Sequence, residues 1–186
     1  IREGIFFPDT YDIYETSLAN EESLLNRMIA QFDVVADESW LSSPPPDLGV
    51  SPYEVLIISS LIEEEAALEE ERGKIARVIY NRLANNIPLG IDATIIYALG
   101  GERELTLSDL AVDSPYNTRL VQGLPPTPIS APGRASINAA LNPAAGNWFY
   151  YVRTDELGIG SHTFVETQEE FDAAVVICIE RDLGCG

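Results

Sequence analysis

One glutamate in the acidic stretch 63–71 occupies a position where helix packing would favour an apolar residue. At about 100° per residue in an α-helix, Glu65 falls in the middle of the apolar stripe centred on Ile58, whereas Glu63 and Glu64 point to the opposite half. A carboxyl group on a buried face is disfavoured as an anion, so its pKa rises. Such a group can act as the general acid that protonates a glycosidic oxygen, as in lysozyme. The alternative is that Glu65 pairs with an arginine or caps backbone groups, without a catalytic role.

Other polar residues that could do chemistry have an equally plain structural interpretation. Asp92 stands at the expected start of a short helix, where an aspartate commonly serves as the N-cap. His162 is the only histidine, and a lone histidine in a strand is more often structural than catalytic. A Ser-His-Asp triad has no nucleophile-elbow motif to support it. The aromatic cluster 148–151 is able to stack on sugar rings, but it also fits the core of a strand.

The sequence contains no phosphate-binding loop, dinucleotide-binding fingerprint or zinc-ligand spacing, so we expect no metal and no organic cofactor. Eleven basic against thirty acidic residues give a formal net charge of −19, which repels nucleic acid. No apolar stretch is long enough to span a membrane, and no signal-peptide pattern is present. The two cysteines, Cys178 and Cys185, form either a local disulfide in an oxidising compartment or two idle thiols.

The elements that must position these residues are mostly helical. A length of 186 residues with 46 % hydrophobic content predicts one compact domain over 1–186. Within it we expect an N-terminal segment and helix (1–41), a proline-rich loop (42–50) and a core (51–186). The predicted fold class is α+β with a small antiparallel hairpin. Apolar spacing and capping signals place helices at 17–37, 51–67, 70–85, 95–99, 135–141 and 167–182, a short turn at 108–110, and strands at 148–153 and 162–165.

A series of short blocks, collinear over nearly the whole chain, resembles the endolytic murein transglycosylases of the YceG-like (MltG) family. The blocks are Glu3-Gly4, Phe7 to Tyr11, Ser60 to Glu65, Glu71-Arg72, Val78 to Leu83, Asp92 to Tyr97, Ser114 to Thr118, Gly123 to Pro126, Ile129 to Gly133 and His162 to Phe164.

The resemblance implies non-hydrolytic cleavage of the β-1,4 bond between N-acetylmuramic acid and N-acetylglucosamine, which leaves a 1,6-anhydro-muramoyl end. In this family one glutamate acts first as acid and then as base, so no second carboxylate is obligatory, unlike in paired-carboxylate hydrolases. The family's catalytic glutamate corresponds to Glu65, which the helical wheel also selects, and Glu63 is the rival if the register differs.

The positions that match the family motifs imply residues that line a sugar-binding cleft and residues that support them. Asparagine and threonine side chains can bond N-acetyl and hydroxyl groups, and Tyr116 can stack on a ring. Arg82 or Asp92 could instead hold Glu65 in place. The residues assigned on this basis are Asn81, Arg82, Asp92, Thr94, Tyr97, Tyr116, Asn117, Thr118, His162 and Thr163.

The chain also departs from the family's pattern. Glu64 replaces a common lysine, and its charge would push the pKa of Glu65 further upward. Ala93, Arg119 and Asn142 replace a common proline, tyrosine and histidine, which leaves substrate preference open.

Family members usually carry an N-terminal membrane anchor and a LysM-like lobe ahead of this block, and this chain has neither. The resemblance therefore implies an extracytoplasmic placement at the cytoplasmic membrane, with peptidoglycan strands as substrate and cell-wall synthases as partners. Two alternatives stay open. One is a non-catalytic wall-binding scaffold that recruits synthases. The other is a hydrolase in which Glu65 and Asp92 activate water.

Overall fold

The computed structural model describes residues 3–12, 21–101 and 103–184. Within these residues, six α-helices and one two-stranded antiparallel sheet confirm the predicted mostly helical α+β class. The α-helices are α1 (Glu21–Glu38), α2 (Pro52–Glu65), α3 (Arg72–Ala84), α4 (Asp92–Ala98), α5 (Arg134–Leu141) and α6 (Gln168–Glu180). The strands are β1 (Tyr150–Arg153) and β2 (His162–Val165), and 3-10 turns occupy Pro46–Leu48, Glu69–Glu71 and Asp109–Ala111.

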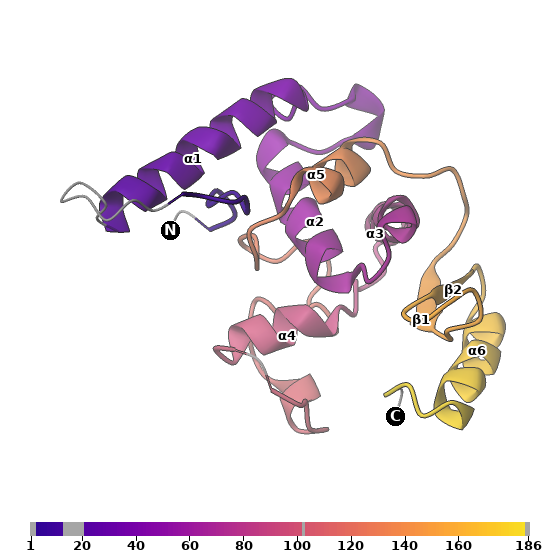
Figure 1. The fold of residues 1–186 in the computed structure, drawn as a ribbon. Coiled ribbons are helices and arrows are strands. Elements are labelled where there is room, and N and C mark those ends of the chain that lie inside the picture. Colours follow the sequence, from indigo (N-terminus) through magenta and orange to yellow (C-terminus); the bar gives the residue numbers. More distant parts are fainter. Residues whose placement is uncertain (1–2, 13–20, 102, 185–186) are drawn as a thin grey trace.

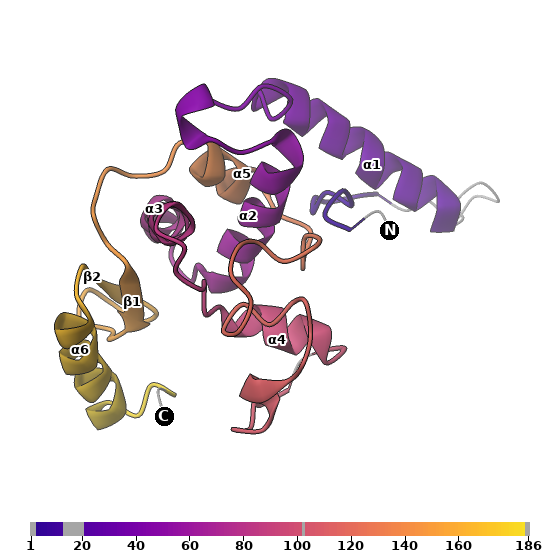
Figure 2. The same cartoon turned by 180° about the vertical axis from the view of Figure 1, so that it is seen from behind.

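The helices α2, α3 and α5 form the centre of the molecule (Figure 1). The long helix α1 lies on one side of them, and the β1–β2 hairpin with α6 lies on the opposite side, in both views (Figures 1 and 2). The helix α4 lies near the C-terminal end of α2 (Figure 1). The end of α2 therefore lies among α3, α4 and the hairpin.

Helix α2 begins where local chemistry predicts it and is buried on all sides. Ser51 and Glu54 form the expected reciprocal capping box, and proline occupies the first helical position. Every residue from 55 to 62 is buried. The hydroxyl groups of Ser59 and Ser60 donate to helix carbonyl oxygens, and Ser60 Oγ also accepts from the backbone of Ile129. The buried polar groups of α2 thus have partners, as burial requires.

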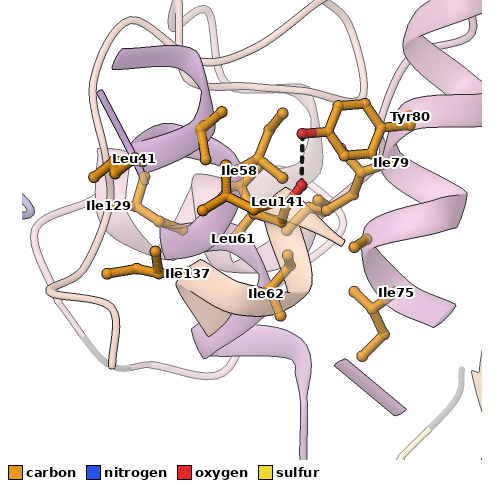
Figure 3. Close-up of a cluster of buried hydrophobic side chains, with 14 of the residues drawn as sticks. Leu41, Ile58, Leu61, Ile62, Ile75, Ile79, Tyr80, Ile129, Ile137 and Leu141 are labelled. Carbon is orange, nitrogen blue, oxygen red and sulfur yellow. Dashed lines mark hydrogen bonds between the residues drawn. The ribbon is translucent and has the colours of Figure 1, made fainter. Parts of the chain in front are cut away.

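The main hydrophobic core surrounds α2 (Figure 3). Side chains from α2, α3 and α5 interdigitate there, and burying each large aliphatic side chain contributes roughly 1.5–3 kcal/mol. Tyr80 of α3 brings a polar atom into this cluster. Its hydroxyl donates a hydrogen bond to the carbonyl oxygen of Ala140 at 2.9 Å (Figure 3). This core fixes α3 and α5 relative to α2.

The hairpin joins a second, smaller apolar cluster. Val152 packs with Ala174 and Cys178 of α6, whose N-terminus has the predicted capping box of Thr167 and Glu170. Cys178 is fully buried and disulfide-bonded. The other cysteine of the sequence, Cys185, lies outside the described residues.

Several predicted boundaries are corrected by the structure. The helix expected at 17–37 ends at Glu38, one residue later than predicted, and its predicted first residues, 17–20, lie outside the described part. Helix α2 ends at Glu65 because Ala66 is extended, with φ −86° and ψ 107°. The strand begins at Tyr150 and not at 148, and the carbonyl groups of residues 148 and 149 accept hydrogen bonds from side chains of α3. The backbone N–H of Phe149 still donates to the carbonyl oxygen of Val165 at 3.0 Å. No helix within the described ranges is both long and apolar enough to cross a bilayer.

Candidate active site

Glu65 is the last residue of α2, where the chain turns toward the hairpin. Its Oε2 accepts a hydrogen bond from the hydroxyl of Tyr151 at 2.7 Å. The side chain is half-buried, so densely packed protein surrounds a carboxyl group that keeps some access to solvent. This combination is what a proton donor to an external substrate requires.

The surroundings raise the pKa of Glu65 above its ordinary value. Desolvation by burial is the largest cause, and the negative charges of Asp92 and Glu64 act in the same direction. The hydrogen bond from Tyr151 and the proximity of His162 lower the pKa and oppose this rise. The net result favours a protonated carboxyl group, as the sequence predicted for this position.

Tyr151 reaches Glu65 because of the register of the hairpin. Tyr151 lies opposite Phe164 and two residues from the Arg153–His162 pair, so the side chains of Tyr151, His162 and Phe164 share one face. Their rings are in contact: the Tyr151 ring lies 5.5 Å from His162 and 5.7 Å from Phe164. Burial and the adjacent Glu65 raise the pKa of Tyr151 well above its ordinary value, so the phenol keeps its proton and remains a donor.

His162 is fixed by a buried carboxylate. Glu71, which is 3 % exposed, accepts from the backbone N–H of His162 at 2.9 Å and contacts its Nδ1 at 2.8 Å. The predicted site residue His162 is therefore close to Glu65 but bonded to Glu71. The pair holds the start of β2 against the turn that precedes α3.

The rival glutamate Glu63 has a different environment from Glu65. Its Oε2 accepts from the backbone N–H of Gly133 at 3.0 Å and from the hydroxyl of Ser136 at 2.6 Å, both at the N-terminus of α5. Its Oε1 lies 4.0 Å from an Arg72 nitrogen. These contacts fix the Glu63 side chain at the start of α5, which suits a structural role.

Asp92 does not cap α4, which corrects the prediction. The N-cap position is Ile91, and its backbone N–H is bonded by the hydroxyl of Thr118. Asp92 is the first residue of α4 and forms two hydrogen bonds with Arg119, at 2.7 and 3.0 Å. Both side chains are partly exposed, and Asp92 is close enough to raise the pKa of Glu65.

Asn81 and Arg82 bind the segment that leads into β1. The amide of Asn81 donates to the carbonyl oxygens of Gly146 and Trp148. The guanidinium of Arg82 donates to the carbonyl oxygens of Phe149 and of the loop at 88–89. The guanidinium of Arg82 also lies 5.0 Å from the centroid of the Tyr150 ring, so these two predicted residues tie the hairpin to α3.

Three further predicted residues are buried and bonded inward. Thr94 and Thr118 share a hydrogen bond of 3.0 Å beneath the start of α4. The amide of Asn117 donates to the carbonyl oxygens of Leu110 and Val112 and accepts from the backbone of Arg119. Their hydrogen bonds shape the loop between α4 and residue 119.

The tyrosines and Thr163 have other locations. Tyr97 and Tyr116 are half-buried, with ring centroids 5.0 Å apart, and the Tyr116 hydroxyl bonds Thr127 at 2.8 Å. Thr163 pairs with Val152, so it lies on the hairpin face that turns toward α6, away from Tyr151. The structure therefore gathers Asp92 and His162 around Glu65, and it does not bring Thr163 there.

Two residues of this site, Tyr151 and Glu71, are absent from the sequence-based assignment. Tyr151 was visible only as part of an aromatic strand, and Glu71 only as part of a matched block. Strand alternation limits Tyr151 to one of two faces, but no local signal says which face meets Glu65. Within the described residues, no three or more His, Cys, Asp and Glu side chains are grouped to hold a metal ion.

Comparison with known proteins agrees with this architecture. The YceG-like family model matches residues 1–176. The chain belongs to the YceG-like family. An endolytic murein transglycosylase of Bacillus subtilis is 37 % identical over 173 residues, which are 92 % of this chain and 46 % of the relative. An endolytic murein transglycosylase of Streptococcus pneumoniae serotype 2 is 34 % identical over 179 residues, which are 93 % of this chain and 31 % of the relative.

A solved structure shares the fold of this YceG-like chain. The crystal structure of a yceG-like protein from Listeria monocytogenes matches with a TM-score of 0.78 and 36 % identity, over 91 % of this chain and 53 % of that one. The YceG-like chain spans less than half the length of the two curated relatives and about half of the solved one.

Proposed function

We propose that this chain is the catalytic part of an endolytic peptidoglycan lytic transglycosylase with Glu65 as its single acid and base. The observation that carries the proposal is the Tyr151 hydroxyl bonded to a half-buried glutamate whose pKa is raised. The relatives named as endolytic murein transglycosylases support the substrate class. The geometry of Glu65 supports the same residue that the family resemblance indicates.

The reaction needs one proton donor that becomes a proton acceptor. Protonated Glu65 gives its proton to the bridging oxygen as the bond from muramoyl C1 to that oxygen breaks. The C6 hydroxyl of the same muramoyl residue then attacks C1, and the Glu65 carboxylate takes the hydroxyl proton. A 1,6-anhydro end forms, no water is consumed, and Glu65 returns to its protonated form.

The surrounding residues have supporting roles in this proposal. Tyr151 orients the carboxyl group by holding Oε2, which leaves Oε1 for the substrate. Asp92 sets the local charge, and its two bonds to Arg119 oppose a role as the base of a hydrolase. The partly exposed rings of Tyr97 and Tyr116 are the saccharide contacts we propose, whereas Thr94, Asn117 and Thr118 shape the loop that carries them.

The cellular setting is part of the same proposal. Peptidoglycan lies outside the cytoplasmic membrane, so the chain would face the wall, held by an N-terminal anchor that belongs to the intact protein. The greater length of the relatives leaves room for such a segment and for contacts with cell-wall synthases.

Mass spectrometry of digested peptidoglycan tests the activity. Wild-type protein is expected to release 1,6-anhydro products, and Glu65→Gln should lower the rate by about 10²–10⁴-fold, since a neutral amide cannot supply the proton. Glu64→Gln is the matched control, because Glu64 is exposed on the same turn and its charge is the smallest of the effects on the pKa of Glu65, so turnover should change only slightly. Products with a reducing end would favour the hydrolase, and a lack of any product would favour the scaffold.

A further inference from the structure

Lys74 is the only lysine of the chain and lies in the same aromatic cluster as Tyr151. It is half-buried on α3, and its Nζ lies 5.3 Å from the centroid of the Phe164 ring. The Phe164 ring in turn contacts Tyr151, whose hydroxyl bonds Glu65. An ammonium group is thus held one aromatic ring away from the residue that orients the proposed acid.

Lys74 differs from the other cations that the structure describes. Each of the nine arginines within the described ranges donates a hydrogen bond to a protein oxygen, whereas Lys74 contacts only the face of Phe164. The arginines are Arg27, Arg72, Arg77, Arg82, Arg103, Arg119, Arg134, Arg153 and Arg181. A cation–π contact positions an ammonium group without neutralising it, so all of its charge remains available to an anion.

The net charge of the whole chain adds weight to the lack of an acidic partner at Lys74 in the part of the chain that the structure describes. A formal net charge of −19 repels anionic ligands, and thirty acidic residues offer many possible partners for one lysine. Lys74 has no acidic partner among the described residues, and the rings of Phe164 and Tyr151 lie between it and Glu65. Its charge offsets this repulsion locally for a negatively charged substrate.

We propose that Lys74 binds a carboxylate on the muramoyl side of the glycan strand, an inference that rests on the function proposed above. Muramic acid carries a lactyl carboxylate, which is free in peptide-free strands and amide-linked to a stem peptide in substituted ones. The stem peptide has carboxylates of its own. Both sources offer the same chemistry to an ammonium group, which donates up to three hydrogen bonds.

Equilibrium binding to muramoyl strands tests the inference without turnover. Calorimetry is run on the Glu65→Gln protein with and without Lys74→Gln, using peptide-free strands, peptide-bearing strands, and peptide-bearing strands whose carboxylates are amidated. Loss of Lys74 should weaken binding of the carboxylate-bearing strands by about three- to tenfold, the range of one partly exposed charge-assisted hydrogen bond. The loss should shrink at high ionic strength, and the fully amidated strands should not respond.

Matched variants separate a specific contact from a general charge effect. Lys74→Arg keeps the charge and should restore most of the affinity. Arg134→Gln removes one positive charge at an exposed ion pair with Glu38 of α1 and should leave binding unchanged. A loss confined to peptide-free strands assigns the lactyl carboxylate, and a loss confined to peptide-bearing strands assigns the stem peptide.

The two proposals can fail separately. The role of Lys74 would be overturned if Lys74→Gln left the affinity for all three strands unchanged. It would also be overturned if the substitution weakened binding equally for charged and amidated strands. Both results hold even if wild-type protein releases anhydro products. Conversely, a wild-type protein that cleaves nothing, but whose binding depends on Lys74 and on the carboxylate, would overturn the catalytic proposal alone.

Discussion

The hydroxyl of Tyr151 donates a hydrogen bond to Glu65 across 86 positions of sequence, at a distance of 2.7 Å. It connects the C-terminal end of the central helix α2 with the first strand of the hairpin. Because the raised pKa of Tyr151 keeps the phenol protonated, the direction of this bond does not change near neutral pH. The bond fixes one carboxylate oxygen and stabilises the charged form of Glu65.

Tyr151→Phe should therefore change both the rate and its dependence on pH. Removing the donor raises the pKa of Glu65, since the Tyr151 hydrogen bond lowers it in the wild-type protein. The alkaline limb of kcat/KM, where the acid loses its proton, should move to higher pH. Poorer orientation of the carboxyl group should lower kcat by about tenfold.

Tyr150→Phe is the matched control for that experiment. Tyr150 is the preceding residue on the opposite face of β1, where its ring packs against Phe171 of α6. It should leave the pH profile unchanged. A Tyr151→Phe profile that overlays the wild-type profile would mean that the hydrogen bond does not govern the proton donor.

The raised pKa of Glu65 also predicts how stability depends on pH. The folded chain holds this proton more tightly than the unfolded chain does. The favourable contribution is full below the unfolded pKa and is lost as the pH rises through the folded pKa, above which the buried anion destabilises the fold. Glu65→Gln removes the anion, so its advantage in unfolding free energy should be smallest near pH 4 and grow toward pH 8.

Urea denaturation between pH 4 and pH 8 measures this difference. In thermal unfolding at the same pH values, each kcal/mol gained in the free energy of unfolding should raise Tm by about 2–4 °C in a chain of this size. Glu64→Gln, at the exposed neighbouring position, should show a difference from wild type that varies with pH much less than that of Glu65→Gln, because the charge of Glu64 has the smallest effect on the pKa of Glu65. Parallel stability curves for Glu65→Gln and wild type would contradict the assigned direction of the pKa.

Glu63→Gln should lower stability but leave turnover nearly intact, whereas Glu65→Gln should strongly reduce turnover without lowering stability. The Glu63 carboxylate accepts two hydrogen bonds at the N-terminus of α5, so its substitution should lower the free energy of unfolding by about 1–2 kcal/mol. Turnover by the folded protein should remain within a few-fold of wild type. Denaturation and rate measurements on the same preparation test both points, and an inactive but fully stable variant would make Glu63 the acid instead.

The parts of the fold that could be predicted from the sequence are those set by neighbouring residues. The capping boxes at Ser51 and Thr167 locate the starts of α2 and α6 because both partners lie within three residues. The start of α4 was predicted less well. A hydroxyl 27 residues away, on Thr118, bonds Ile91 and makes capping by Asp92 unnecessary.

In the candidate site, too, local features could be predicted from the sequence and long-range contacts could not. The helical wheel selected Glu65 from an apolar stripe, although α2 is buried on all sides and the stripe is only part of a wider apolar surface. What distinguishes Glu65 in three dimensions is its contact with Tyr151, and no local pattern encodes a pairing between α2 and the hairpin. For the same reason the inward bonding of Thr94 and Asn117 could not be separated from a surface role by residue type.

Arg119 controls how strongly Asp92 acts on Glu65. The guanidinium forms two hydrogen bonds with Asp92 and offsets a negative charge that raises the pKa of Glu65. In Arg119→Gln that charge is no longer offset, so the pKa of Glu65 should rise further and the alkaline limb of kcat/KM should move to higher pH. The stability cost should stay below about 1 kcal/mol, because the pair is partly exposed.

A double-mutant cycle with Asp92→Asn isolates this electrostatic route. Asp92→Asn alone should move the alkaline limb to lower pH. Without Asp92 the partly exposed guanidinium of Arg119 is no longer held near Glu65, so Arg119→Gln in that background should move the limb much less than in the wild-type background. The coupling should weaken as salt is added, since screening reduces interactions between partly exposed charges. A limb that moves equally in both backgrounds would show that Arg119 acts on Glu65 by a route other than Asp92.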